Sequence, residues 1–262
     1  MMTVPDFQKA KSKKKLTMIT CYDYSFASLL NKTEIDALLV GDSTSVLMHG
    51  YKSTVMATMD MMLMHTSAVA RGAPDKLIIA DMPFLSFRKS FSDTMENVQR
   101  LIQVGAHGVK LEGAEGNLEI IRHLVESGVP VMGHLGLTPQ HFFKFGGNKV
   151  QARDKEAKNL FRKQAQQLVD AGCFSIVFEC VPSSLAKDVA ENLQVPVIGI
   201  GAGAFVDGQV LVLQDMLGMS EDFHPKFLKT YLNGAELIKG AVQQYVREVQ
   251  TQEFPLERHS YF

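Results

Sequence analysis

Several ionisable residues of this chain stand at or near the ends of short apolar runs. Within one run, "GVKLE", Lys110 and Glu112 are two positions apart. Because side chains alternate between the two faces of a strand, this spacing directs Lys110 and Glu112 to the same side. Several carboxylates in one cavity repel one another, and a hard divalent cation is the simplest compensation. The residues concerned are Asp42, Asp81, Lys110, Glu112, His134 and Glu179.

Each carboxylate by itself could simply cap the helix that follows it, since such positions favour Asp and Ser. Their recurrence on successive runs favours a shared site instead. Oxygen ligands alone are typical of Mg²⁺, which keeps several waters and binds through one or two carboxylates plus substrate oxygens. Zinc is disfavoured, because no cluster of His and Cys has ligand spacing.

The elements that must position these residues form an alternating pattern. Short apolar runs that are nearly continuous indicate strands of a parallel sheet covered by helices on its outer face. Eight such runs in 262 residues favour an α/β fold, the (β/α)8 TIM barrel, whose typical length is about 250 residues. An open doubly wound sheet is the structural alternative. The runs are 17–21, 37–41, 77–81, 108–112, 130–134, 174–179, 196–200 and 210–214.

Between the runs, apolar residues recur with helical spacing, and glycines follow several of these segments. The segments 44–57 and 140–152 are candidate active-site loops. No linker, repeat or low-complexity segment divides the chain, so we expect residues 1–262 to form a single barrel domain. A short N-terminal extension and a C-terminal helix, roughly 227–250 and outside the barrel, complete it. The other helices are predicted at 58–71, 115–128, 153–172 and 182–193.

Composition limits the partners and the compartment. The chain has 27 Lys and Arg, 28 Asp and Glu and a formal net charge of -1, which does not favour nucleic acid or an anionic membrane as a partner. Its three cysteines, Cys21, Cys173 and Cys180, include no CxxC pair, which suits a reducing compartment. No apolar stretch approaches a membrane span, and the N-terminus lacks a secretory pattern. We therefore expect a cytoplasmic protein.

At the residues that carry this chemistry the sequence resembles the ketopantoate hydroxymethyltransferase family. The matching stretches run in family order over most of the chain and include "LLVGDS" (38–43), "IIADMPF" (78–84), "VKLEG" (109–113), "GHLGLTPQ" (133–140) and "FECVP" (178–182). The resemblance implies a barrel of the phosphoenolpyruvate/pyruvate superfamily type and a homodecamer. It also implies transfer of a hydroxymethyl group from 5,10-methylenetetrahydrofolate to 3-methyl-2-oxobutanoate. The product would be 2-dehydropantoate, in pantothenate and coenzyme A biosynthesis.

The resemblance also implies roles for individual residues, with a Mg²⁺-stabilised enolate as the intermediate. Glu179 matches the general base that removes the proton from C3. For His134 two possibilities stay open, contact with substrate or folate, or fixation by hydrogen bonds of the core. The family's magnesium-associated acids match Asp42, Asp81 and Glu112, and its substrate-binding positions match Asp42, Ser43, Asp81 and Lys110.

The sequence departs from the family pattern in the two candidate loops. Thr44 and Ser45 replace the usual Leu-Gly, Met56 replaces a common proline, and Asn148 replaces a frequent tyrosine. These changes concern substrate affinity and loop closure more than the type of reaction. Two other functions remain open. One is another Mg²⁺-dependent lyase or mutase of the superfamily, although such enzymes use a reactive loop cysteine that neither loop contains. The other is a non-catalytic paralogue that binds an oxo acid or folate.

Overall fold

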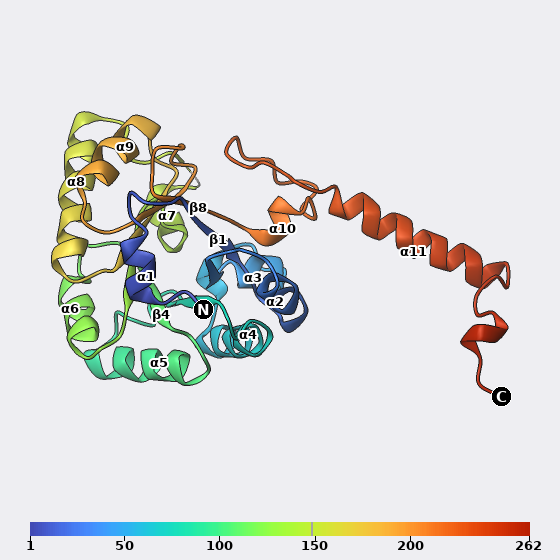
Figure 1. Cartoon of the computed structure of the whole chain (residues 1–262). Helices are drawn as coiled ribbons and strands as arrows, with labels where there is room; N and C mark the ends of the chain where they lie inside the picture. The colour runs from blue at the N-terminus through green and yellow to red at the C-terminus, as the bar shows by residue number, and fades with distance from the viewer. Residues whose placement is uncertain (148) are drawn as a thin grey trace. The chain divides into compact units, whose positions relative to one another are not determined.

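Eight parallel strands close into a barrel in which β1 pairs with both β2 and β8 (Figure 1). The computed structural model describes residues 1–147 and 149–262, so the departure at Asn148 lies outside the described residues. The closed barrel confirms the predicted fold class and excludes the open sheet. The strands are β1 (Leu16–Thr20), β2 (Ala37–Val40), β3 (Leu77–Asp81), β4 (Gly108–Glu112), β5 (Val131–Gly136), β6 (Ser175–Glu179), β7 (Val197–Ile200) and β8 (Gly208–Leu211).

Helices follow most of the strands and cover the outside of the barrel (Figure 1). Every residue of β3 and β4 is buried, because side chains face either the barrel interior or the helices. The helices are α1 (Val4–Lys9), α2 (Tyr24–Asn31), α3 (Thr44–Leu47), α4 (Met59–Gly72), α5 (Phe91–Gln103), α6 (Leu118–Glu126), α7 (Phe142–Phe145), α8 (Lys155–Asp170), α9 (Ser183–Asn192), α10 (Leu213–Met216) and α11 (Gly234–Gln250), with 3-10 turns η1 (Thr54–Met56), η2 (Pro139–His141) and η3 (Glu257–His259).

Two predicted boundaries were wrong. The run 210–214 is not one strand, because β8 ends at Leu211 and α10 begins at Leu213. The closing strand must pair with β1 and β7 together, and this register begins at Gly208. The C-terminal helix begins at Gly234 rather than at 227. Ahead of it, the backbone N–H groups of Tyr231 and Gly234 donate to carbonyls in and just after α10, which holds the segment out of helical geometry.

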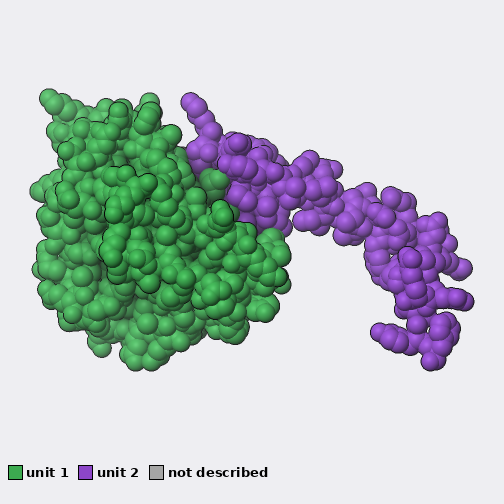
Figure 2. All heavy atoms as spheres, in the orientation of Figure 1, with its two compact units in different colours: residues 1–211 green, residues 212–262 purple. Residues whose placement is uncertain are grey.

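Residues 1–211 and 212–262 form two compact units (Figure 2). The first contains the barrel with α1 to α9, and the second contains α10, α11 and η3. A single domain over 1–262 therefore stays a prediction, as does packing of α11 outside the barrel. Among the described residues, no helix is both long and apolar enough to span a membrane.

The short N-terminal extension belongs to the core. Thr3 and Asp6 form a capping box at the start of α1, and Phe7 is completely buried. Its ring packs edge-on against Phe174, with centroids 5.9 Å apart. The same apolar cluster includes residues from the first half of several strands, such as Leu16 and Leu77. Apolar side chains therefore fill the N-terminal end of the barrel and leave its C-terminal end to polar groups.

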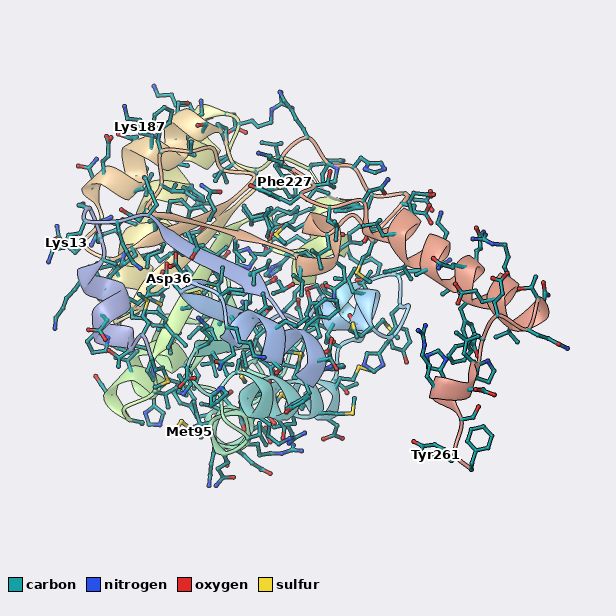
Figure 3. All side chains as sticks on the ribbon, turned by 45° about the vertical axis from the view of Figure 1, so that its right-hand side comes forward. Lys13, Asp36, Met95, Lys187, Phe227 and Tyr261 are labelled. Carbon is teal, nitrogen blue, oxygen red and sulfur yellow. The ribbon has the colours of Figure 1, made fainter. Side chains whose placement is uncertain are left out.

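The basic cluster of residues 11–15 lies at the surface, as does Lys187 on α9, and Figure 3 shows the side chains of Lys13 and Lys187 pointing away from the barrel. Lys11 is half-buried, and its Nζ lies 2.7 Å from Asp207 Oδ2. The cluster is thus partly neutralised by acids of the chain itself.

The glycine that ends β5 is required by a close backbone approach. Gly136 has φ +98°, and a Cβ there would lie 2.1 Å from the carbonyl oxygen of Glu179. Gly128 has a similar φ, +89°, with nothing within 4 Å of such a Cβ. Gly128→Ala should therefore cost only the strain of the backbone, about 1–2 kcal/mol. Gly136→Ala should cost about 1–3 kcal/mol more through overpacking. Urea unfolding at fixed protein concentration measures both, and equal losses would contradict the close approach.

Candidate active site

The barrel brings all the predicted ionisable residues to its C-terminal end. Asp81, Glu112 and Glu179 are the last residues of β3, β4 and β6, and Asp42 lies two residues after the end of β2. The strand register places Lys110 beside Asp81 and Glu112 beside His134. Except for Glu179, these residues are at most 4% exposed. The Glu179 side chain is 17% exposed, which makes it the most accessible of the acids.

Lys110 is the buried cation among these acids. Its Nζ lies 3.1 Å from Asp81 Oδ1, and the other oxygen, Asp81 Oδ2, accepts the backbone N–H of Asp42 at 3.1 Å. Burial raises the pKa of Asp42, and the charges of Asp81 and Glu112 raise it further. For Lys110 burial lowers the pKa, but the three surrounding carboxylates outweigh that effect and raise it above its usual range. The ammonium is therefore charged at neutral pH.

Gln140, in the turn η2, joins two of the acids, a role that sequence reasoning missed. Its Nε2 donates to Asp42 Oδ2 at 2.8 Å and to the Met82 carbonyl at 2.9 Å. Its backbone N–H donates to Glu112 Oε2 at 3.0 Å. The available signal was its place directly after the "GHLGLTP" stretch. Gln140 thus holds one carboxylate through its side-chain amide and another through its backbone N–H, without changing the charge of the site.

Ser43 is held by Tyr22, a second residue without a predicted role. The Tyr22 hydroxyl lies 2.7 Å from Ser43 Oγ. Tyr22 is completely buried, and burial raises the pKa of its hydroxyl above the usual range. The phenol therefore stays protonated and can orient the serine hydroxyl at the rim of the acid cluster. Its signal in the sequence was its place just after the first strand, in "TCYDYSFA".

Two of the departures from the family pattern, Thr44 and Ser45, directly follow Asp42 and Ser43 in the chain. Thr44 and Ser45 are completely buried in α3. Ser45 Oγ donates to the Asp42 carbonyl at 2.8 Å and lies 3.2 Å from the Ser53 carbonyl. Met56, in η1, is exposed. The serine thus links the backbone of Asp42 to the loop before α4.

His134 connects the lysine with the accessible acid. Its Nδ1 lies 3.2 Å from Lys110 Nζ and 3.3 Å from Glu112 Oε1, and its Nε2 lies 3.2 Å from Glu179 Oε2. Burial lowers the pKa of His134, and the charge of Lys110 lowers it further. We assign the neutral ring, whose Nδ1 accepts from Lys110 and whose Nε2 faces Glu179 Oε2. The histidine therefore lies within the cluster, between the lysine and Glu179.

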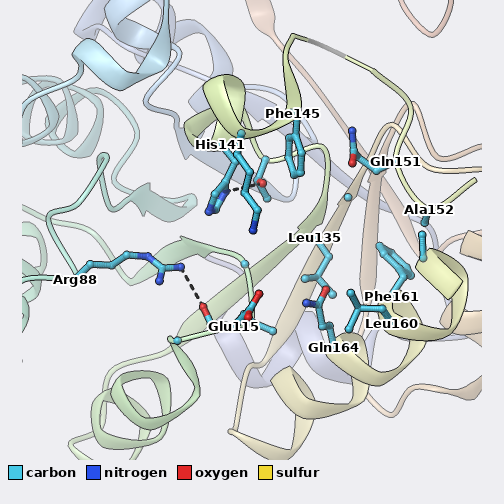
Figure 4. Close-up of a pocket in the computed structure, with 17 residues that line it drawn as sticks. Arg88, Glu115, Leu135, His141, Phe145, Gln151, Ala152, Leu160, Phe161 and Gln164 are labelled. Atoms are coloured by element: carbon cyan, nitrogen blue, oxygen red, sulfur yellow. Dashed lines mark hydrogen bonds between the residues drawn. The ribbon is translucent and has the colours of Figure 1, made fainter.

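A pocket of about 540 Å³ opens beside the acids, between the loops that follow β3, β4 and β5 and the helix α8 (Figure 4). Of the described residues that line the pocket, none is a predicted site residue. Gly113 of the lining adjoins Glu112 in the chain, however, and Gly136 lies against the backbone of Glu179.

Comparison with known proteins agrees with this geometry. A family model described as ketopantoate hydroxymethyltransferase matches residues 1–257. The chain belongs to the ketopantoate hydroxymethyltransferase family. It is 56% identical to the 3-methyl-2-oxobutanoate hydroxymethyltransferase of Bdellovibrio bacteriovorus over 262 residues, all of both chains. Identity to the enzymes of the same name from Francisella tularensis subsp. tularensis and Coxiella burnetii is 53% and 49%, each over at least 99% of both chains. The family consists of transferases, so the chain is an enzyme of that class.

Solved structures share the fold of this ketopantoate hydroxymethyltransferase family member at low sequence identity. Phosphonopyruvate hydrolase matches with a TM-score of 0.65 and 11% identity over 100% of this chain and 92% of the other. 2,3-Dimethylmalate lyase, a member of the PEP mutase/isocitrate lyase superfamily, matches with a TM-score of 0.60 and 13% identity. The match covers 100% of this chain and 93% of the other. These likenesses agree with the closed (β/α)8 barrel and show a shared fold.

The three cysteines of this protein should be unreactive. Burial raises the pKa of Cys21 to about 11 and that of Cys173 and Cys180 to about 12. At pH 8 the thiolate fraction of Cys180 then falls about 10³-fold below that of an ordinary thiol, and alkylation slows in proportion. Mass spectrometry after iodoacetamide treatment should find three modified thiols in urea and almost none in the native protein. Rapid native labelling of Cys180 together with loss of activity would instead favour a cysteine-dependent superfamily lyase.

Proposed function

We propose that this chain transfers a hydroxymethyl group from 5,10-methylenetetrahydrofolate to 3-methyl-2-oxobutanoate and forms 2-dehydropantoate, a step of pantothenate and coenzyme A biosynthesis. Family membership over the whole chain supports the reaction type. The observation that carries the proposal is the cluster itself. In it, His134 lies between an accessible carboxylate, Glu179, and a buried ammonium, Lys110. Removal of a proton next to a ketone needs such a base together with positive charge for the keto oxygen.

Lys110 and Ser43 fit the binding of a small 2-oxo acid. The ammonium remains charged and lies at the polar end of the barrel, where it can pair with a carboxylate or with negative charge on the keto oxygen. The Ser43 hydroxyl, oriented by Tyr22, can donate to the substrate carboxylate. Because the site is buried, these interactions are stronger than they would be in water.

Glu179 fits the role of the base that removes the C3 proton. It is more accessible than the other acids, and one of its oxygens, Oε2, lies 3.2 Å from His134 Nε2. Its other oxygen can face a substrate. The donor carries a methylene group, so a water molecule supplies the hydroxyl oxygen of the product as the bonds from that carbon to the two folate nitrogens break. Glu179 can return the C3 proton to one of these nitrogens, and a proton from the water restores the N–H of the other.

The donor set fits Mg²⁺, which would supply positive charge to the oxygens of the oxo acid. Asp42 and Asp81 are buried oxygen donors whose carboxylates are linked through the Asp42 N–H. Among residues 1–147 and 149–262, no three His, Cys, Asp or Glu side chains are arranged to hold a metal ion by themselves. Mg²⁺ usually keeps several waters and binds through one or two carboxylates plus substrate oxygens. Asp42 and Asp81 would hold the ion, and Glu112 would face it through water.

The other two functions account for less of the structure. A binding protein without catalysis has no need for an accessible carboxylate beside a histidine, as Glu179 is. A superfamily lyase or mutase would need a reactive cysteine, and the thiol nearest the site, Cys180, has a raised pKa. We also propose a cytoplasmic homodecamer, from the resemblance to the family; sedimentation of the purified protein tests the assembly.

Replacing the proposed base tests the reaction directly. Glu179→Gln keeps the shape and a hydrogen-bond partner for His134 but cannot accept the C3 proton. Exchange of deuterium into C3 of 3-methyl-2-oxobutanoate, followed by NMR, should fall by about 10²–10⁴-fold. Calorimetry should show that the oxo acid still binds. Glu126→Gln, on the exposed face of α6, is the matched control and should exchange at the wild-type rate. Rapid exchange by Glu179→Gln would overturn the assignment.

Metal removal tests the magnesium site. Chelation should abolish transfer, and added Mg²⁺ should restore it. A second measurement is independent of activity, because Mg²⁺ at 100 times its dissociation constant should stabilise the wild-type fold by about 2.7 kcal/mol. Asp42→Asn should lose most of that stabilisation. Full activity in chelator, or equal stabilisation of wild type and variant, would contradict the site.

A further inference from the structure

The pocket beside the acids has two chemically different sides. Figure 4 shows Arg88 on the opposite side of the pocket from the apolar side chains of Leu160 and Phe161, with Glu115 between them. Leu160 lies on α8 and is 54% exposed, so its side chain is available to a ligand in the pocket that it lines. The volume of about 540 Å³ lies within the range of pockets for organic ligands and exceeds what a small oxo acid fills.

Arg88 is aimed at this pocket by its surroundings. Its Nη2 donates to the Glu115 carbonyl at 3.2 Å, and its guanidinium lies 5.5 Å from the centroid of the Phe87 ring. A Cβ at Gly116 would lie 3.0 Å from Nη1, so the glycine lets the guanidinium rest on the loop after β4. Across the described part of the chain, no carboxylate forms an ion pair with Arg88. Most of its five N–H donors therefore remain available to a ligand.

The charge of the lining favours an anion. Arg88 and Lys144 are its two cations, and the Glu115 side chain is its one carboxylate. Burial lowers the pKa of His141, which therefore adds little positive charge at neutral pH. Phe145 supplies an aromatic ring near His141, with ring centroids 5.9 Å apart. The chemistry thus suits a molecule with a flat apolar or aromatic body and negatively charged groups.

The location restricts what that molecule can be. Gly113 lines the pocket and directly follows Glu112, and a Cβ on Gly113 would lie 3.7 Å from His141 Cε1 and 3.9 Å from Arg88 Nη2. The cationic side of the pocket is therefore next to the acid cluster. A ligand there would lie alongside an oxo acid bound at Lys110 rather than replace it.

We infer that this pocket binds the one-carbon donor. The aromatic part of 5,10-methylenetetrahydrofolate packs against Leu160, Phe161 and Phe145, and its anionic groups pair with Arg88 and Lys144. This assignment rests on the proposed function, because it takes a folate as the donor. It names the donor-binding residues that neither the motifs nor the family comparison supplies.

The test uses the purified full-length protein and tetrahydrofolate as the probe. Arg88→Gln and Lys144→Gln should each weaken tetrahydrofolate binding by at least tenfold in calorimetry, and raise the KM for the donor more than they lower kcat. Ala157→Phe, in the first turn of α8, places a ring in the pocket and should weaken binding further. Lys163→Gln removes an exposed cation of the same helix that does not line the pocket, and is the matched control.

Donor-independent C3 exchange of 3-methyl-2-oxobutanoate shows in each variant whether the acid cluster is intact. A loss of tetrahydrofolate binding with exchange retained supports the assignment. Wild-type affinity for tetrahydrofolate in all three pocket variants overturns it. If the wild type binds tetrahydrofolate but neither exchanges nor transfers, the proposed function fails while the pocket assignment stands, so the two failures are distinguishable.

Discussion

The site depends on one buried ammonium that faces more negative charge than it can neutralise. Lys110 lies 3.1 Å from Asp81, with Asp42 and Glu112 close enough to raise its pKa. Three buried carboxylates with one lysine leave an excess of negative charge, which is costly in a dry interior. The raised pKa of Asp42 reports that cost. A bound cation or a proton relieves it, so the resting site is arranged to accept positive charge together with an anionic substrate.

The rest of the barrel confines the charged groups to one end and supplies neutral hydrogen-bond partners there. Apolar side chains and Phe7 of α1 fill the N-terminal end, which confines the ionisable groups to the other end. There, Gln140 donates to two carboxylates without adding charge, and the neutral Tyr22 hydroxyl is hydrogen-bonded to Ser43. Only Glu179 is left accessible, and His134 lies beside it. The buried carboxylates that would bind positive charge are therefore different from Glu179, which would remove the proton.

Prediction from sequence succeeded where the cause was local. The apolar runs gave the strands, and the period of two placed Lys110 and Glu112 on one side, where both are buried. It failed for β8, whose limits are set by pairing with β1 and β7, strands distant in the sequence. It also missed Gln140 and Tyr22, because their partners, Asp42 and Ser43, come from other loops. The start of α11 was likewise decided by bonds to α10.

The sequence by itself determined the alternation of strands and helices, the polar residues at strand ends and, through its motifs, the family. These follow from local periodicity and residue type, which tertiary context seldom reverses in buried strands. Only the tertiary structure decided the neutral His134 between Lys110 and Glu179, the amide link of Gln140, and the pocket that Arg88 and Leu160 line from opposite sides. Closure of the barrel brings loops distant in sequence together, and hydrogen-bond partners and cavities exist only once those loops meet.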